Sequence, residues 1–513
     1  MVAAGFLCVI VGAALHWPDF VMASSMHWRM VGMPFSPTMI AGMGFIGLGL
    51  VLAAVGVVRP SRPTGDRLMV RVDAMDDRRL TVADILFVSA LMFGMVIDVM
   101  KPATIGFVIP GARAEYGLTT LEIALWPLVA LFGTAVGSLA WGALADRIGR
   151  RGGLLLATLL FIATSICGAM PAFWLNLVTC FLMGASAGGM LPLVFALLAE
   201  VAPQRHRGLL GVLVGGIGST GGYVAASVAA AALVPSFSWR VLWLIGLPTG
   251  VVMLALTRYI PESPRFLVLH GREDEARRSL QRYGASLAQT VSDSLDERIE
   301  RGVRDAIMTL LRPPFAVQTF GLVFFGFAWG LANFGFLTWL PTLLGKGAGS
   351  TAVWNGVLAK SAVVALVGGL VVVWLYARWR TRASIVTFAV VTSLALVVLG
   401  IVMTSGGSGF LIGVLVILFL IGINGSYAMV SVYAAEVFPT VVRGRGTGLI
   451  AAATKTGGLL GPQLVALILV LGGGATVTAL LVAVPLLGAG LVLWLKGVET
   501  RDLSLANIQT TMQ

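Results

Sequence analysis

Charged side chains are scarce in this chain: Asp, Glu, Lys and Arg make up 11% of its 513 residues, whereas 58% of the residues are hydrophobic. A soluble domain usually carries about a quarter charged residues. The scarcity of charge therefore excludes a soluble protein. Together with a mean hydropathy of +0.94, it indicates an integral membrane protein.

Cysteine and histidine are almost as rare, with three and four residues in the chain. The cysteines all lie inside apolar stretches and the histidines are scattered, so neither a disulfide framework nor a metal-binding motif is readable. A P-loop motif for phosphate binding is also absent. We therefore expect no enzyme, no cofactor and no metal site. The net charge is +12. The basic residues lie in short clusters between apolar runs, which argues against nucleic acid as a partner.

Long apolar runs are abundant. A helix needs roughly 20 apolar residues to cross the hydrocarbon core of a bilayer, and the chain offers fourteen runs of about that length. They extend over about 2–22, 38–58, 83–110, 120–143, 153–170, 173–200, 208–234, 239–260, 316–344, 351–376, 383–404, 408–437, 445–471 and 475–497. We predict an all-α membrane protein in which each run is one transmembrane helix.

Charged segments divide these runs into groups. We expect an extra N-terminal transmembrane helix pair at 1–60, a basic cytoplasmic linker at 61–82, an N-terminal six-helix half at 83–260, a cytoplasmic segment at 261–315, a C-terminal six-helix half at 316–497 and a cytoplasmic tail at 498–513. Every second loop is rich in arginine, which is typical of cytoplasmic loops. This pattern predicts that both termini are cytoplasmic. The first run has no basic stretch before it and no convincing cleavage signal after it, so we expect an uncleaved anchor. The arginine-rich, lysine-poor usage favours a bacterial inner membrane.

An internal repeat links the two halves. The stretch "LLAEVAPQRHRG" at 197–208 recurs as "YAAEVFPTVVRG" at 433–444, with a shift of 236 residues. "PESPR" at 261–265 is followed by "VETR" at 498–501, with a shift of 237 between the two glutamates. Transporters are commonly built from two such repeats, with the substrate site near the membrane midplane where the repeats meet.

The stretch "GALADRIGRRGG" at 142–153 resembles the loop signature of the major facilitator superfamily. The stretches "AEVAPQRHRG", "PESPRFL" and "AEVFPTVVRG" are similar to those of its sugar-porter, organic-ion and aromatic-acid/proton symporter branches. The resemblance covers about 80–505, so the first helix pair lies outside it. It implies two six-helix halves, transport by alternating access and a monomer. The matching loop of the second half, "ARWRTRAS" at 377–384, has no acidic residue, which leaves the symmetry of the gate open.

The resemblance also implies a set of gating residues at the cytoplasmic ends of the helices. Their charges would pair when the inner side closes and separate when it opens, and the glycines would allow close approach and a tight turn. The set is Gly142, Asp146, Arg147, Gly149, Arg150, Glu200, Arg207, Glu262, Arg265, Glu436 and Arg443. The alternative is that these charges only set the membrane topology.

Asp98 and Lys101 fall near the middle of one apolar run. A charge at that depth costs on the order of 2.5 to 3.5 kcal/mol on insertion scales, so it usually faces a protein interior or a wet cavity. The two residues share one helix face, and they either neutralise each other or serve function. We interpret Asp98 as the protonation site, with Lys101 as its partner.

Lysine occurs at only five positions, of which Lys101, Lys360 and Lys455 lie in apolar runs. An unpaired lysine in a neutral cavity favours an anionic cargo, although Lys360 could instead reach the membrane surface. Asn333 and Asn424 fall near mid-depth and could orient a carboxylate or hydroxyl groups. Aromatic residues such as Trp329 and Tyr427 could stack on a ring or serve helix packing.

These observations predict a secondary active transporter that moves a small organic anion, a carboxylate, with protons. A proton-coupled sugar or polyol transporter is the first alternative, suggested by "PESPR". A membrane sensor that does not transport is the second. The expected partners are a small anionic substrate, protons and the lipid bilayer.

Overall fold

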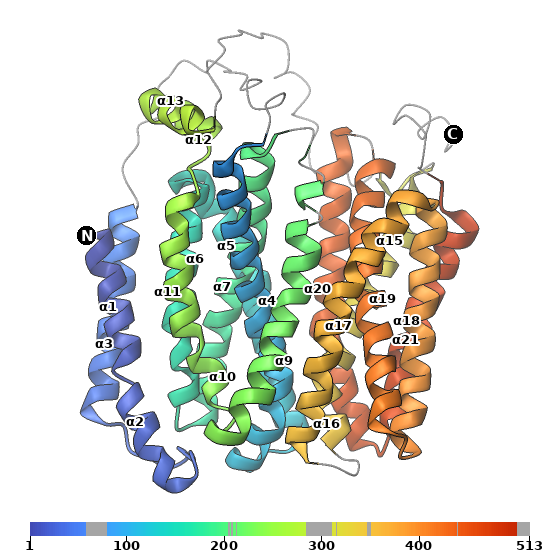
Figure 1. The fold of residues 1–513 in the computed structure, drawn as a ribbon, viewed down its shortest axis with the longest axis horizontal. Helices are drawn as coiled ribbons and strands as arrows, with labels where there is room; N and C mark the ends of the chain where they lie inside the picture. Colours follow the sequence, from blue (N-terminus) through green and yellow to red (C-terminus); the bar gives the residue numbers. More distant parts are fainter. Residues whose placement is uncertain are drawn as a thin grey trace. The chain divides into compact units, whose positions relative to one another are not determined.

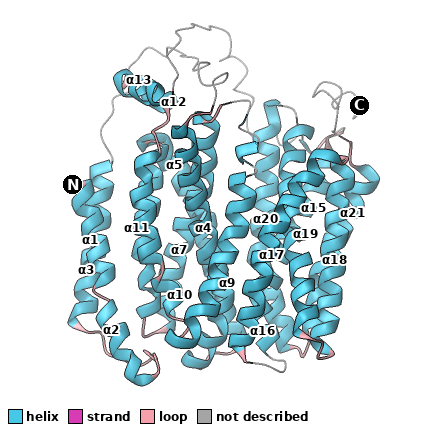
Figure 2. Cartoon of the chain, viewed as in Figure 1, coloured by secondary structure: helices cyan, strands magenta, loops and turns pink. Residues whose placement is uncertain are grey.

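The computed structural model describes residues 1–57, 80–203, 206, 209–211, 213–283, 310–313, 315–345, 350–438 and 440–499. In these residues the regular structure is entirely helical (Figure 2). Fourteen helices are long and apolar enough to cross a membrane, which confirms the predicted fourteen spans. Residues 61–79 of the predicted linker at 61–82, and most of the predicted tail at 498–513, lie outside the described residues.

The chain divides into two compact units. The first unit comprises Met1–Thr104 and Val129–Leu295, and the second comprises Ile105–Leu128 and Asp296–Gln513. The boundaries fall within α4 and α5, so the end of α4 and the start of α5 are grouped with the second unit.

The helices up to residue 283 are coloured from blue through green in Figure 1. They are α1 (Val2–Ala14), α2 (Trp17–Met22), η1 (Ala23–Met26), α3 (Pro37–Val57), α4 (Val82–Tyr116), α5 (Thr120–Ile148), α6 (Arg150–Ala163), η3 (Thr164–Ala169), α7 (Phe173–Val201), η4 (Leu213–Ile217), α9 (Gly218–Phe237), α10 (Val241–Leu244), α11 (Gly246–Leu256), η5 (Thr257–Tyr259), α12 (Pro264–Leu269) and α13 (Glu273–Arg282).

The remaining helices belong to the second unit. They are α15 (Ala316–Gly330), η7 (Leu331–Phe336), α16 (Leu337–Gly345), α17 (Thr351–Arg378), α18 (Thr381–Thr404), α19 (Gly409–Val437), α20 (Thr440–Val470) and α21 (Ala475–Lys496). Within the span Ala316–Gly345, η7 is a π-helical segment, a local irregularity that often occurs at functional sites.

Each unit contains a close helix contact made by the same short sequence. Thr-Gly-Gly occurs at 220–222 in α9 and at 456–458 in α20, again 236 residues apart. A Cβ on Gly222 would lie 2.8 Å from Val96 O in α4, and a Cβ on Gly457 would overlap Phe327 O in α15. Only glycine permits such an approach, and the two contacts use different glycines of the short sequence, the second one in α9 and the first one in α20.

The N-terminal helices α1 and α3 form an antiparallel hairpin that packs against α6 and α11 within the first unit. Gly5 and Gly12 of α1 lie against Gly49 and Gly42 of α3, where an added Cβ would come within 2.6 to 2.7 Å of backbone atoms. In each of these two contacts the residue numbers add up to 54. The hairpin therefore has a fixed register, set by backbones in direct contact.

The hairpin also explains why α6 is unusually enclosed. In the apolar window of the span Arg150–Ala169, 89% of the residues are buried, whereas the value for the other thirteen spans is at most 61%. A Cβ on Gly152 would lie 3.1 Å from Val57 at the end of α3. The extra helix pair thus covers a face of α6 that would otherwise be exposed.

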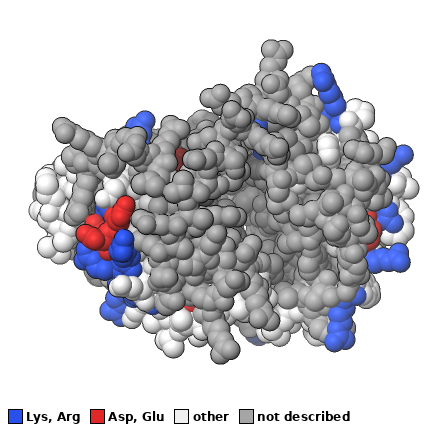
Figure 3. Space-filling model, turned by 90° about the horizontal axis from the view of Figure 1, so that it is seen from above, with Lys and Arg blue, Asp and Glu red and all other residues white. Residues whose placement is uncertain are grey.

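The segment after α11 forms a small helical cap. Phe266 and Leu267 of α12 pack against Ala276 of α13, and the buried Tyr283 donates a hydrogen bond to Tyr259 O over 3.3 Å. The first turn of α13 is acidic and its last turn is basic, as α-helix dipoles favour. Figure 3 shows acidic and basic side chains together on the face that carries this cap.

Candidate functional site

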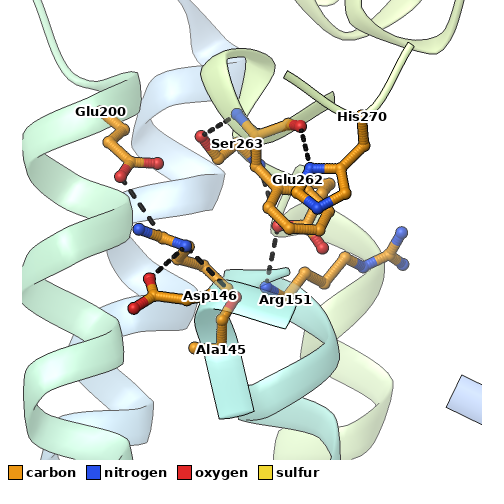
Figure 4. Close-up of polar contacts among 9 residues, drawn as sticks. Ala145, Asp146, Arg151, Glu200, Glu262, Ser263 and His270 are labelled. Atoms are coloured by element: carbon orange, nitrogen blue, oxygen red, sulfur yellow. Dashed lines mark hydrogen bonds and ion pairs between the residues drawn. The ribbon is translucent and has the colours of Figure 1, made fainter. Parts of the chain in front are cut away.

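The N-terminus of α6 carries a cluster of charged residues within the first unit (Figure 4). Arg150 Nη1 lies 3.0 Å from the Asp146 carboxylate, and Arg150 Nε lies 3.4 Å from Glu200 at the end of α7. The Arg150 and Glu200 side chains are only 23% and 22% exposed, whereas Asp146 is 71% exposed. The pair with Glu200 is therefore the better shielded of the two.

Glu262 covers the same helix end from the loop before α12. Its carboxylate accepts hydrogen bonds from the backbone N–H groups of Arg151, over 3.1 Å, and of Ser263, over 3.0 Å. The first N–H groups of an α-helix have no partner within the helix and carry its positive dipole end. Glu262 supplies both an acceptor and a negative charge there.

Burial raises the pKa of the Glu262 carboxyl, although the hydrogen bonds from backbone N–H groups act in the opposite direction. The net result is a glutamate that holds its proton more readily than an exposed one. This group lies outside the membrane spans, close to the Arg150 cluster.

Gly149 makes the contact between Glu262 and α6 possible. It is the N-cap of α6, with a φ of 94° and a ψ of 158°, a conformation that is essentially restricted to glycine. A Cβ at this position would also overlap the Glu262 carboxylate. Gly142, in contrast, has no described atom within 4 Å of an added Cβ, so no close approach explains it.

The second unit repeats this arrangement with different residues. Glu499 accepts a hydrogen bond of 2.8 Å from Thr381 N, the first residue of α18. The segment that carries Glu499 is held by Arg382, which donates to Gly497 O, and by Tyr433, which donates to Val498 O. The sequence analysis did not place Glu499 among the site residues, although the repeat of "PESPR" as "VETR" pointed to it.

The other expected gating residues can be placed only in part. Arg147 is exposed on α5. Arg207 lies outside the described residues, and the side chains of Arg265, Glu436 and Arg443 are not described. The structure thus brings together Asp146, Arg150, Glu200, Gly149 and Glu262, all in the first unit.

Asp98 and Lys101 are both buried in α4, with 5% and 1% of their surface exposed. Lys101 Nζ donates to Phe161 O over 3.2 Å and to Thr164 Oγ1 over 3.3 Å, and it lies 4.5 Å from the centre of the Phe161 ring. Neither acceptor is the Asp98 carboxylate, so these contacts do not support the hypothesis that the two residues pair.

The position of Lys101 has a clear physical reason. Phe161 O belongs to the last turn of α6, just before the chain changes to the 3₁₀ segment η3, and a cation is favoured at such a helix end. Gly246 provides the room, because an added Cβ would lie 2.6 Å from Lys101 Nζ.

A second set of polar and aromatic residues gathers in the second unit. Trp329 of α15 stacks on Tyr427 of α19, with ring centres 4.2 Å apart, and its indole donates to Ile423 O over 2.7 Å. Asn424 follows Ile423 and donates to Leu420 O in its own helix. Asn333, within η7, is half-buried.

Lys455 lies at the level of Trp329. Its neighbour Thr454 contacts Gly330, the residue after Trp329, through its backbone oxygen, and Lys455 itself is half-buried. Lys360 differs, because it is exposed on α17. The second unit therefore brings an aromatic stack, two amides and one ammonium to four neighbouring elements, α15, η7, α19 and α20.

Metal-binding groups of the usual kind are not found in the described part of the chain. No group of three or more His, Cys, Asp or Glu side chains is arranged there to hold a metal ion. Cys8, Cys167 and Cys180 are free thiols. The chemistry that the described residues offer is that of ion pairs, hydrogen bonds and aromatic stacking.

Solved structures show which fold this is. A D-xylose–proton symporter matches with a TM-score of 0.66 at 15% identity, covering 82% of this chain and 100% of the symporter. An inward-open structure of the xylose transporter XylE from E. coli matches with a TM-score of 0.67 at 16% identity, covering 83% of this chain. The fold is therefore that of the major facilitator superfamily.

Sequence comparisons identify the family. The model of the family described as "Sugar (and other) transporter" matches residues 85–512, so the chain belongs to this family. The niacin transporter NiaP of Acinetobacter baylyi is 26% identical, over 81% of this chain and 94% of the relative. The 4-hydroxybenzoate transporter PcaK of Pseudomonas putida is 29% identical, over 77% of this chain and 89% of the relative. The protein is therefore a secondary transporter and not an enzyme.

Proposed function

We propose that this protein carries a small aromatic carboxylate across a bacterial inner membrane together with protons, by alternating access. The observation that carries the proposal is the set in the second unit: the Trp329–Tyr427 stack beside Asn424, with Lys455 at the same level. Aromatic faces suit a planar ring, and an ammonium and amide groups suit a carboxylate.

The relatives support the same class of cargo. One is a niacin transporter and another a 4-hydroxybenzoate transporter, and both compounds are aromatic rings with a carboxyl group. The xylose symporters share the fold, but at 15% to 17% identity they say nothing about the cargo. A neutral sugar or polyol remains the rival cargo and is separated from the acid by experiment.

Asp98 is the proposed proton site. It is the acidic residue in the middle of α4, and it is 5% exposed, so protonation would remove a charge from a buried position. Lys455 is the proposed partner of the cargo's carboxylate, with Asn333 and Asn424 orienting the bound molecule. Lys360 and Lys101 are secondary candidates. Both termini are proposed to be cytoplasmic.

Uptake into proteoliposomes tests the proposal. With the lumen more alkaline than the medium, labelled 4-hydroxybenzoate or nicotinate should accumulate, and xylose should not compete. Asp98→Asn should abolish accumulation against the gradient but leave exchange of labelled for unlabelled substrate. Lys455→Gln should raise the KM for the acids about tenfold or more, because one charge-assisted contact is lost, whereas Lys496→Gln should not.

Two results would overturn the assignment. Accumulation of xylose with no effect of aromatic acids would identify the rival cargo. An Asp98→Asn variant that still accumulates substrate in response to the pH difference would remove Asp98 from the proton path. A protein without measurable flux of any solute would instead favour the sensor alternative.

A further inference from the structure

The end of the α1–α3 hairpin contains a histidine held as metal ligands are held. His16 is completely buried, and its Nδ1 lies 2.9 Å from Gly12 O. Because a carbonyl oxygen only accepts hydrogen bonds, Nδ1 carries the proton and Nε2 keeps its lone pair. No described group makes a hydrogen bond with Nε2. A backbone carbonyl on one ring nitrogen and an open lone pair on the other is the usual arrangement of a metal-binding histidine.

The register of the hairpin shows which residue of α3 faces His16. Gly12 opposes Gly42 and Ile46, and further along Asp19 accepts hydrogen bonds from Ser36 over 2.8 Å and from Thr38 over 3.1 Å. The residue numbers in these pairs add up to between 54 and 58. His16 contacts Gly42, at a sum of 58. Met39 lies three residues before Gly42 in α3, and its number and that of His16 add up to 55, so this register puts Met39 opposite His16.

Met39 belongs to the seam and not to the lipid-facing side of α3. It is 2% exposed, and it shares the buried face of the helix with Gly42 and Ile46. An imidazole nitrogen and a thioether sulfur together form a donor set that suits soft or borderline cations, and a thioether selects Cu(I) over hard ions.

Methionine is concentrated around this position. Six of the chain's 20 methionines lie within the 22 residues from Met22 to Met43, where an even distribution would place about one. Met22 of α2 and Met26 of η1 are 56% and 44% exposed, so they offer further thioether groups at the surface in the segment that joins α1 to α3. Lipid contact can account for exposed methionines, but not for the buried Met39.

The turn that follows is held in an unusual conformation. His27 and Trp28 both have positive φ angles, 56° and 63°, although neither is glycine. Trp28 is fixed by stacking on Phe20, with ring centres 4.8 Å apart, and by a backbone hydrogen bond of 2.7 Å to Ala23 O. Non-glycine residues in this region are uncommon and cluster at binding sites. The surrounding structure thus fixes a compact turn between η1 and α3.

We propose that His16 Nε2 and the Met39 sulfur bind one soft monovalent cation, Cu(I) or its analogue Ag(I), at the end of the α1–α3 hairpin. The site lies outside the region that matches the transporter family, which begins at residue 85. Binding requires no oxidant or reductant, because the ion enters and leaves as a monovalent cation. The ion would hold α1 and α3 together where the glycine contacts end.

Titration of the purified full-length protein with Cu(I) tests this inference. Under anaerobic conditions, in competition with the chromogenic chelator bicinchoninate, the protein should hold one Cu(I) per chain. Met39→Leu should weaken this binding at least tenfold without lowering the melting temperature by more than a few degrees, because leucine and methionine have similar volumes. His16→Gln should have the same effect on Cu(I).

Controls separate this site from other soft ligands. Met183→Leu, a buried methionine of α7, and Cys8→Ser should leave the binding unchanged. X-ray absorption at the copper edge should show both sulfur and nitrogen ligands. Equal Cu(I) binding by the wild type and the Met39→Leu variant, a sulfur-only spectrum, or no binding at all would overturn the inference. Ag(I) titrated by calorimetry provides the same comparison without redox chemistry.

Discussion

At the scale of single residues, glycines and charges act together. Gly149 turns the chain into α6, and its missing side chain leaves the space that the Glu262 carboxylate fills. Lys101 depends on Gly246 in a similar way, because the glycine leaves space for the ammonium group. In both places a glycine, which has no side chain, leaves the space that a charged group occupies.

Gly149→Ala tests the first of these dependencies. Alanine should be strained at a φ of 94° and should displace Glu262, at a cost of about 1 to 3 kcal/mol. Gly142→Ala is the matched control in the same sequence stretch: it lies within α5 with open space around it, and should be neutral or stabilising by up to about 1 kcal/mol. Thermal unfolding in detergent measures both, and equal melting temperatures for the two variants would contradict the expectation.

The sequence predicted part of this site and missed another part. The resemblance of "GALADRIGRRGG" implied that its glycines allow close approach and a tight turn, and Gly149 has the positive φ of such a turn. The spacing of Asp98 and Lys101 showed only that they share a helix face. It could not show that Lys101 turns to Phe161 and Thr164, because that choice depends on Gly246, which lies far away in the sequence.

At the scale of helices, α6 and α18 begin in the same way. Each first turn is covered by a glutamate from a segment that follows much later in the chain, Glu262 for α6 and Glu499 for α18. Glu499 is 118 residues from Thr381, so local helix signals could not reveal the contact. The repeat in the sequence contained the information, but only the structure connects it with a helix terminus.

The raised pKa of Glu262 gives this helix end a pH dependence. The folded protein keeps the proton at pH values where the unfolded chain, with the ordinary value of 4.5, has lost it. The group therefore favours the folded state more strongly as the pH falls towards 4.5, and this contribution is lost as the pH rises through the raised pKa.

Glu262→Gln should remove this dependence. Melting temperatures of the wild type and the variant, measured from neutral pH down to 4.5, should differ by an amount that shifts in favour of the wild type as the pH falls. Glu275→Gln, on the exposed first turn of α13, serves as the control and should not reproduce this shift. If the difference in melting temperature between the wild type and Glu262→Gln stayed constant across this pH range, Glu262 would not be the cause of the pH dependence.

At the scale of the whole molecule, the fourteen spans were readable from the sequence because each apolar run is long enough to cross a bilayer. The sequence did not show that α1 and α3 cover α6, since the sequence of α6 resembles that of any other apolar helix. Its burial follows from the packing of α1 and α3 against it.

Removal of residues 1–60 should therefore expose α6 without removing any proposed transport residue. We expect a lower melting temperature in detergent, by several degrees, and substrate uptake in proteoliposomes close to that of the full chain. Lipid can replace the lost contacts there, because it is as apolar as the helix pair. A well-folded truncated protein that no longer transports would instead assign the pair a part in the transport cycle.

The docking of α3 at Gly152, where an added Cβ would lie 3.1 Å from Val57, has a practical consequence. A bulkier amino acid at this position would separate the α1–α3 hairpin from α6, while the hairpin and the transport helices keep their own internal packing. The two parts could then be studied in one intact polypeptide without the contact between them.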